Sequence, residues 1–192
     1  MKPTSLGHKY MDYGHLKSIL DTAGGSVYLA DIPSLRANLQ LFLQPFRRQY
    51  RNTNLAYSYK TNYLAEFCLE AERLEMYAEV VSGTEYQIAR QYDVPYNHII
   101  FNGPVKTETE LQAALQHGSM VNIECWEEIS KIRSLCREDS KCHFSLGLRC
   151  SFSSDDKTCS RFGFTSTDGQ LQSAFRQLHD IRNCSVVGLQ CH

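Results

Sequence analysis

Short apolar runs alternate with helix-periodic segments along most of the chain. The runs begin near residues 54, 77, 98, 120 and 143, so that neighbouring runs start 21 to 23 residues apart. Between them, apolar residues recur at i, i+3, i+4 and i+7, as they do between Leu64 and Leu74, which is typical of a helix with one buried face. This β-then-α period predicts a series of parallel β/α units.

The apolar runs resemble strands that are covered on both faces, because they do not alternate cleanly between polar and apolar residues. Parallel strands of this kind form either a (β/α) barrel or a doubly wound sheet. A closed barrel needs eight strands, and the count from residue 54 onward gives six. We therefore expect an α/β fold with an incomplete barrel. The expected strands are Leu55–Lys60, Tyr77–Val81, His98–Asn102, Met120–Glu124, His143–Cys150 and Ser185–His192.

The N-terminal part of the chain lies outside this period. Val27–Ala30 is predicted to be a strand, and a helix is expected to begin near Pro33 and Ser34. No linker or low-complexity segment divides the chain, so we expect one domain over residues 1–192. In that domain the barrel units begin near residue 54, and Val27–Asp31 lies outside the barrel. The helix is expected to turn Leu35, Leu39, Leu41 and Phe42 inward.

Composition excludes several classes of protein. The chain is 42% hydrophobic and 21% charged, with a net charge of -1, so it has no electrostatic case for a nucleic-acid partner. No run reaches membrane-spanning length, and residues 1–10 lack the apolar segment of a signal peptide, so we expect a cytoplasmic protein. The eight cysteines contain no CxxC pair, so we expect reduced thiols and no metal site. No GxGxxG motif follows a strand, which argues against a dinucleotide fold.

Lys60 is the strongest candidate for chemistry. It ends an apolar and aromatic run and is followed by Thr61 and Asn62. A strand would fix the amine in space, and apolar neighbours would exclude water and favour a neutral, nucleophilic form. Pyridoxal phosphate is an electrophile that such a lysine binds covalently. The alternative is an ordinary surface lysine at the end of a strand.

Other polar residues follow the expected strands. Chemistry in a (β/α) barrel takes place at the carboxyl ends of the strands. Glu85 has a second explanation, because Ser82 and Glu85 fit a capping box at a helix start. Lys106 also has a second explanation, as a charge in solvent. Arg149 lies in an apolar strand, so its charge needs a partner. The strand-end set is Lys60, Asn62, Ser82, Glu85, Asn102, Lys106, Glu124, Arg149 and His192.

Several motifs occur in a fixed order. Residues 57–62 read Tyr-Ser-Tyr-Lys-Thr-Asn, and residues 79–85 read Glu-Val-Val-Ser-Gly-Thr-Glu. Further segments are Val27–Asp31 with Arg-Ala-Asn at 36–38, Ile99–Lys106, Leu148-Arg149, Ser160–Gly163, and Gly-Leu-Gln-Cys-His at 188–192. Together they resemble the barrel of the fold-type-III pyridoxal-phosphate decarboxylases. This is the family of diaminopimelate, ornithine and biosynthetic arginine decarboxylases, whose barrel is shared with alanine racemase.

The resemblance implies a fold and a set of roles. The fold is the alanine racemase-like (β/α)8 barrel, here with six of eight strands and without the C-terminal β-domain. Lys60 would bond covalently to pyridoxal 5′-phosphate, His192 would stack on its ring, and Ser82, Glu85 and Arg149 would line the pocket. The activity implied is decarboxylation of a basic or diamino amino acid, in polyamine or lysine biosynthesis, by a full-length homodimer.

The resemblance also has departures. The glycine-rich phosphate loop and the β-domain of the family have no counterpart in these 192 residues, so the chain alone is expected to be inactive. One alternative is an amino-acid racemase on the same barrel, although Tyr63-Leu64-Ala65 after the lysine motif favours a decarboxylase. Another alternative is a truncated or regulatory homologue that binds the cofactor without catalysis.

Overall fold

The chain divides between Thr53 and Asn54 into two compact units. The computed structural model describes residues 12–138, 143–152 and 161–192. Ser160 of the predicted Ser-Arg-Phe-Gly turn, as well as Cys142 and Cys159, lies outside the described residues. No described helix combines the length and the apolar character needed to cross a membrane.

The first unit contains two helices, α1 (Tyr13–Ala23) and α2 (Ile32–Gln49). The predicted start of α2 is confirmed, and the Asp31 carboxylate caps it by accepting the backbone N–H of Ser34 at 2.9 Å. The predicted strand at Val27–Ala30 is wrong, because these residues adopt no regular structure. A strand needs a partner for its backbone groups, and no described strand pairs with this segment.

The inward face predicted for α2 is also wrong within this unit. Leu35 and Leu39 are only half-buried, and Leu41 and Phe42 are 52% and 59% exposed. No residue of α1 or α2 is fully buried. Helical periodicity identifies an apolar face, but another element must cover that face to bury it.

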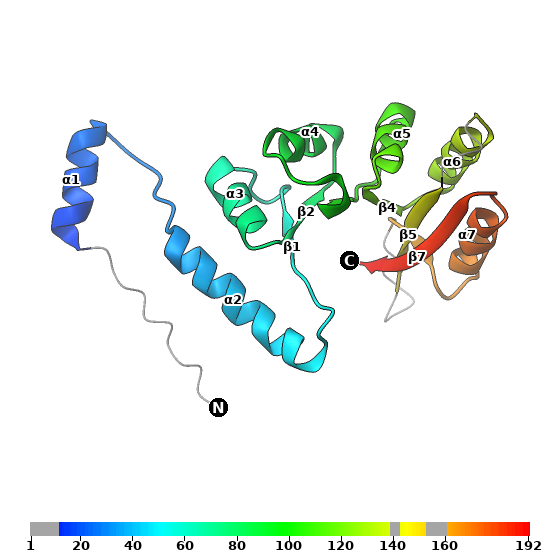
Figure 1. Cartoon of the computed structure of the whole chain (residues 1–192), viewed down its shortest axis with the longest axis horizontal. Coiled ribbons are helices and arrows are strands. Elements are labelled where there is room, and N and C mark those ends of the chain that lie inside the picture. Colours follow the sequence, from blue (N-terminus) through cyan, green and yellow to red (C-terminus); the bar gives the residue numbers. More distant parts are fainter. Residues whose placement is uncertain (1–11, 139–142, 153–160) are drawn as a thin grey trace. The chain divides into compact units, whose positions relative to one another are not determined.

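The second unit is built on one parallel sheet (Figure 1). The six predicted strands are confirmed and follow one another in sheet order, so the sheet matches six strands of an incomplete barrel. A short extra strand, β6 (Phe164–Thr165), pairs with the end of β5 and was not predicted. The six main strands are β1 (Ala56–Ser58), β2 (Tyr77–Val80), β3 (Ile99–Phe101), β4 (Met120–Ile123), β5 (Phe144–Ser151) and β7 (Cys184–Cys191).

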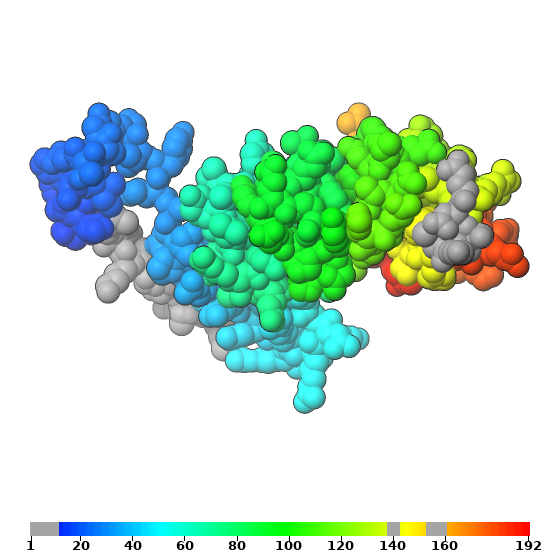
Figure 2. Space-filling model, turned by 45° about the horizontal axis from the view of Figure 1, so that its top comes forward, coloured from blue at the N-terminus to red at the C-terminus, as the bar shows by residue number. Residues whose placement is uncertain are grey.

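A helix follows each of the first four strands, and α7 follows β6. Figure 1 shows these helices along one face of the sheet, and in Figure 2 residues 65–138 form a continuous surface that runs from blue-green to yellow-green. The predicted alternation of strands and helices is confirmed, and the helical pattern at Leu64–Leu74 corresponds to α3. The helices are α3 (Ala65–Arg73), α4 (Gly83–Gln91), α5 (Glu108–Gln116), α6 (Trp126–Glu138) and α7 (Gln170–His179), with a 3-10 turn at Tyr96–His98.

The two faces of the sheet differ in chemistry. Side chains alternate between the faces along each strand. On the face toward the helices, Val80, Phe101 and Leu148 are fully buried in the apolar core. The alternate positions, such as Glu79 and Asn122, carry polar side chains on the inner face. The expectation of strands that are apolar on both faces is therefore wrong near their carboxyl ends.

A β-bulge in β7 fixes the register at the carboxyl end of the sheet. Leu146 pairs with Val186, whereas Gly147 pairs with Gly188, so Val187 is the extra residue in β7. From there to the end of the strand, each β5 residue pairs one position further along β7. A single-residue shift of this kind changes which side chains face each other across the two strands.

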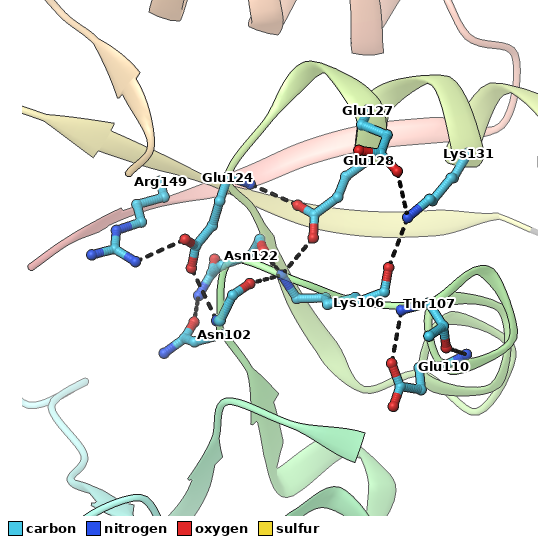
Figure 3. A network of polar contacts seen from close by, with 11 residues as sticks. Asn102, Lys106, Thr107, Glu110, Asn122, Glu124, Glu127, Glu128, Lys131 and Arg149 are labelled. Carbon is cyan, nitrogen blue, oxygen red and sulfur yellow. Dashed lines mark hydrogen bonds and ion pairs between the residues drawn. The ribbon is translucent and has the colours of Figure 1, made fainter. Parts of the chain in front are cut away.

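A buried ion pair ties the loop after β3 to α6 (Figure 3). Lys106 is 0% exposed, and its Nζ lies 3.0 Å from Oε1 of Glu128. The same Nζ donates to the carbonyl oxygens of Gly103 and Asn122 at 2.7 and 2.9 Å. Burial raises the pKa of Glu128, and the Lys106 ammonium partly offsets this. The solvated position considered for Lys106 is therefore wrong.

Removing the charge of Glu128 should destabilise the second unit strongly. Glu128→Gln leaves the Lys106 ammonium buried without a counter-charge, so we expect a loss of about 3–5 kcal/mol in the free energy of unfolding. Urea unfolding followed by the fluorescence of Trp126, the single tryptophan, measures it.

Glu127 provides the matched control on the same helix. Its side chain is 77% exposed and pairs with Lys131 at 3.2 Å. Glu127→Gln should cost about 1 kcal/mol or less, as for other solvent-exposed pairs. Equal losses in the two variants would contradict the role assigned to the buried pair.

Candidate functional site

A cavity of about 570 Å³ opens at the carboxyl ends of the strands. Four of the predicted strand-end residues, Lys60, Asn102, Arg149 and His192, line it together. They lie in or directly after β1, β3, β5 and β7, which are far apart in the sequence but belong to one sheet. The other lining residues are Ser58, Thr61, Glu79, Val81, Gly103, Pro104, Phe162 and Gln190.

Lys60 lies in a tight turn directly after β1. The backbone N–H and the hydroxyl of Thr61 both donate to the Ser58 carbonyl oxygen, at 3.2 and 2.8 Å. Tyr59 is 1% exposed in the core, and its backbone N–H donates to the Glu79 carbonyl oxygen at 2.9 Å. The backbone around Lys60 is therefore anchored, while its side chain is exposed. The dry surroundings expected for this amine are not present in the described residues.

Glu79 is held by two hydrogen bonds on the inner face. Its Oε2 accepts from the Ser58 hydroxyl at 2.5 Å, and its Oε1 accepts from Asn102 Nδ2 at 2.8 Å. Asn102 Oδ1 in turn accepts from Asn122 Nδ2 at 2.7 Å. This polar ladder, Ser58–Glu79–Asn102–Asn122, links β1 to β4 and fixes the carboxylate at the cavity wall.

Gly147 makes room for the last member of that ladder. A Cβ atom at this position would lie 1.8 Å from Asn122 Oδ1. Its register partner Gly188 has no neighbouring atom within 4 Å of an added Cβ. Only Gly147 of the two is therefore required for the polar ladder.

Arg149, another lining residue of the cavity, is fixed by Glu124 (Figure 3). Its NH1 donates to Glu124 Oε2 at 2.8 Å, and Glu124 Oε1 accepts the backbone N–H of Gly103 at 2.9 Å. The Phe162 ring lies 5.3 Å from the guanidinium carbon. Glu124 is thus the partner that we expected for the charge of Arg149 in this strand.

His192 follows β7 at the edge of the cavity, with Gln190 two positions before it. Gln190 pairs in register with Arg149. Its Oε1 is buried and accepts no hydrogen bond from the residues that the structure describes. The cavity wall therefore carries an amide acceptor that a bound molecule with a donor group could satisfy.

Three predicted residues serve other purposes. The Ser82 hydroxyl accepts the backbone N–H of Glu85 at 3.2 Å and caps α4. Glu85 Oε2 accepts from the N–H of Val81 at 2.9 Å, one residue before the position that a capping box requires. Asn62 Oδ1 accepts the N–H of Leu64 at 3.0 Å. These side chains organise helix starts beside the cavity and are not among its lining residues, so a cofactor contact for Ser82 and Glu85 stays a prediction.

The structure also brings in residues that the sequence did not single out. Ser58, Glu79, Asn122 and Gln190 were not candidates, although each is a polar residue at an alternate position of a strand. A period-two search restricted to the last residues of each strand would have found them. The complete capping box lies at α5, where Thr107 and Glu110 satisfy each other's backbone N–H groups.

Two diaminopimelate decarboxylases are similar in sequence to this chain over nearly its whole length. Diaminopimelate decarboxylase of Bacillus subtilis is 25% identical over 197 residues, which cover 96% of this chain and 45% of that protein. The same enzyme of Methanocaldococcus jannaschii is 24% identical over 200 residues, with 97% and 45% covered. The chain therefore spans less than half the length of these relatives.

Solved structures share the fold. The crystal structure of M. jannaschii diaminopimelate decarboxylase in complex with L-lysine superposes with a TM-score of 0.83 at 23% identity, covering 93% of this chain and 44% of that one. The arginine decarboxylase of Paramecium bursaria Chlorella virus gives a TM-score of 0.71 at 16% identity, covering 92% and 47%. The incomplete parallel barrel is thus the fold of these enzymes' corresponding parts.

The family model described as the pyridoxal binding domain of pyridoxal-dependent decarboxylases matches residues 36–192. That range contains every residue that lines the cavity. With the lysine, the carboxylate, the arginine and the histidine gathered on such a barrel, the chain belongs to the pyridoxal-dependent decarboxylase family.

Proposed function

We propose that the protein containing this chain decarboxylates a diamino or basic amino acid with pyridoxal 5′-phosphate bound at the carboxyl ends of its strands. One observation carries the proposal: Lys60, Glu79, Arg149 and His192 line a single cavity. Pyridoxal phosphate is a charged aromatic aldehyde, and an amine, a carboxylate, a guanidinium and an imidazole are groups suited to bind it.

The donor set fits the cofactor group by group. Lys60 Nζ is exposed to the cavity from an anchored turn, so it can reach an aldehyde carbon. Arg149 is immobilised by Glu124 and retains further N–H donors for anionic oxygens. His192 supplies a flat ring, and the volume of about 570 Å³ is in the range of small-molecule sites.

When bound, pyridoxal phosphate supplies an electron sink beside the bond that breaks. The chain's own residues orient the reactants and control protons. Lys60 Nζ would hold the cofactor covalently, and the free amine would carry a proton. The Glu79 carboxylate, held by Ser58 and Asn102, maintains negative charge at a fixed point of the wall. This fixed charge favours a protonated, cationic group next to it.

Diaminopimelate is the first substrate to test, because both relatives compared above are diaminopimelate decarboxylases. Ornithine, arginine and lysine complete the panel, since all combine an amino-acid head with a second basic group. We propose that the full-length protein acts as a homodimer, as the family resemblance implies. Release of carbon dioxide from one of these substrates, with retention of the second amine, is the expected activity.

Lys60→Ala should abolish the covalent attachment of pyridoxal phosphate, because no other lysine lines the cavity in the described residues. The full-length protein is mixed with the cofactor, reduced with borohydride and digested, and the modified peptide is identified by mass spectrometry. We expect the adduct on the peptide containing Lys60 in the parent protein and none in the variant.

Lys60→Arg and Lys17→Ala are the controls. Arginine keeps the positive charge but forms no such bond, so the adduct should also be lost. Lys17 is an exposed lysine of α1 that pairs with Asp21, so its replacement should leave the adduct intact. A full yield of adduct in Lys60→Ala would remove Lys60 from the proposed role.

Gly147→Ala should weaken cofactor binding by about 1–3 kcal/mol, the cost of breaking a buried hydrogen bond and leaving a partner unsatisfied. The added methyl group would collide with Asn122 Oδ1 and displace the ladder that holds Glu79. Gly188→Ala is the matched control, because its methyl group meets no atom. Titration of cofactor absorbance measures both, and equal affinities in the two variants would disprove a role for the ladder.

A further inference from the structure

Two cysteines face each other across the last pair of strands. Cys150 of β5 and Cys191 of β7 are register partners, and their Sγ atoms lie 3.3 Å apart. The Cys150 thiol also donates to the Gln190 carbonyl oxygen at 3.4 Å. Adjacent strands lie about 4.8 Å apart, which is within the range of Cα separations that a disulfide spans.

The β-bulge at Val187 creates this pairing. Before the bulge, residues of β5 pair with β7 residues 40 positions later, as Leu146 does with Val186. In that register Cys150 would face Gln190. After the bulge the separation is 41, and Cys150 faces Cys191. The register of the two strands therefore places the two sulfur atoms in contact.

The two thiols differ in access. Cys191 is exposed, whereas Cys150 is 3% exposed. We propose that Cys150 and Cys191 are a reversible modification site, at which a low-molecular-weight disulfide such as oxidised glutathione drives formation of a bond between β5 and β7. Because the sulfur of Cys150 is buried, Cys191 reacts first, and Cys150 then completes the bond.

The exchange balances in two steps. The Cys191 thiolate attacks one sulfur of oxidised glutathione, so the glutathione disulfide breaks and one glutathione thiolate leaves. The Cys150 thiolate then attacks Cys191 Sγ and displaces the second glutathione. The two protein thiols lose two electrons, the glutathione disulfide gains them, and the two protons from the cysteines end on the two glutathione thiols. Reduced glutathione at high concentration reverses both steps.

The environment of Cys150 disfavours attack on dissolved glutathione disulfide but permits attack on the neighbouring Cys191 sulfur. Burial, followed by the neighbouring Cys191 thiol, raises the pKa of Cys150 to about 11. A thiol that keeps its proton reacts slowly with a dissolved disulfide. Once Cys191 carries glutathione, however, its sulfur stays in contact with Cys150, so the second step needs no encounter in solution.

The pair lies directly behind the cavity. Successive side chains of a strand point to opposite faces, so Arg149 and His192, the immediate neighbours of the two cysteines, line the cavity on the other side. Bond formation must shorten the Sγ–Sγ separation from 3.3 Å to about 2.05 Å. Rotation of the two cysteine side chains supplies this shortening, and the bond then restrains the strand ends that carry Arg149 and His192. This consequence for the cofactor rests on the proposed function.

The bond itself is tested without the cofactor. The full-length protein is incubated with oxidised glutathione, alkylated and mapped by mass spectrometry. We expect the loss of two alkylatable thiols and a peptide pair joined through Cys150 and Cys191. Cys150→Ser should retain one glutathione on Cys191, and Cys191→Ser should leave Cys150 unmodified. No joined peptide, or a joined pair of other cysteines, would overturn the proposal.

Cys125→Ser is the matched control, because it removes a partly exposed cysteine that has no part in the pair. It should form the same joined peptide in the same yield. Pyridoxal phosphate absorbance is then titrated before and after oxidation, and we expect at least fivefold weaker binding after it. Unchanged binding overturns the link to the cavity. If the reduced protein binds no cofactor, the proposed function fails, and the peptide map still decides the thiol proposal.

Discussion

The buried ion pair between Lys106 and Glu128 is the contact on which the cavity wall depends. Lys106 holds the carbonyl oxygens of Gly103 and Asn122, and Glu128 Oε2 accepts the backbone N–H of Glu124 at 2.8 Å. Glu124 then fixes Arg149 at the cavity. Two charges in the interior, far from water, thus determine where the guanidinium of the candidate site lies. A buried pair of this kind holds its partners firmly because either charge alone would be costly.

Side chains that alternate along each strand give the sheet one apolar face and one polar face. Its outer face packs against the helices and is apolar, while the inner face near the carboxyl ends carries the polar ladder and the cavity residues. The bulge at Val187 sets which residues of β5 and β7 are partners beyond Leu146, on both faces of the sheet. It pairs Arg149 with Gln190 on the inside and Cys150 with Cys191 on the outside. Cavity and thiol pair therefore share one structural cause.

Much of the fold could be predicted from the chain. The strand period locates all six main strands, because each apolar run must be buried and each connecting helix covers it. Lys60, Arg149 and His192 could be identified as strand-end residues that share a site. The errors came where a segment depends on a partner. Val27–Ala30 has the composition of a strand, but no described strand pairs with it. Lys106 was expected to be a solvated charge, but it is buried against Glu128.

The sequence by itself determined the order of the elements, the family and the lysine of the candidate site, because these follow from local periodicity and from motifs of adjacent residues. The tertiary structure alone decided which polar groups meet. The contacts Glu79–Asn102, Glu124–Arg149 and Cys150–Cys191 each join residues more than 20 positions apart. They depend on the strand register, which one bulged residue can shift. No local pattern encodes such a shift, since it results from packing between strands.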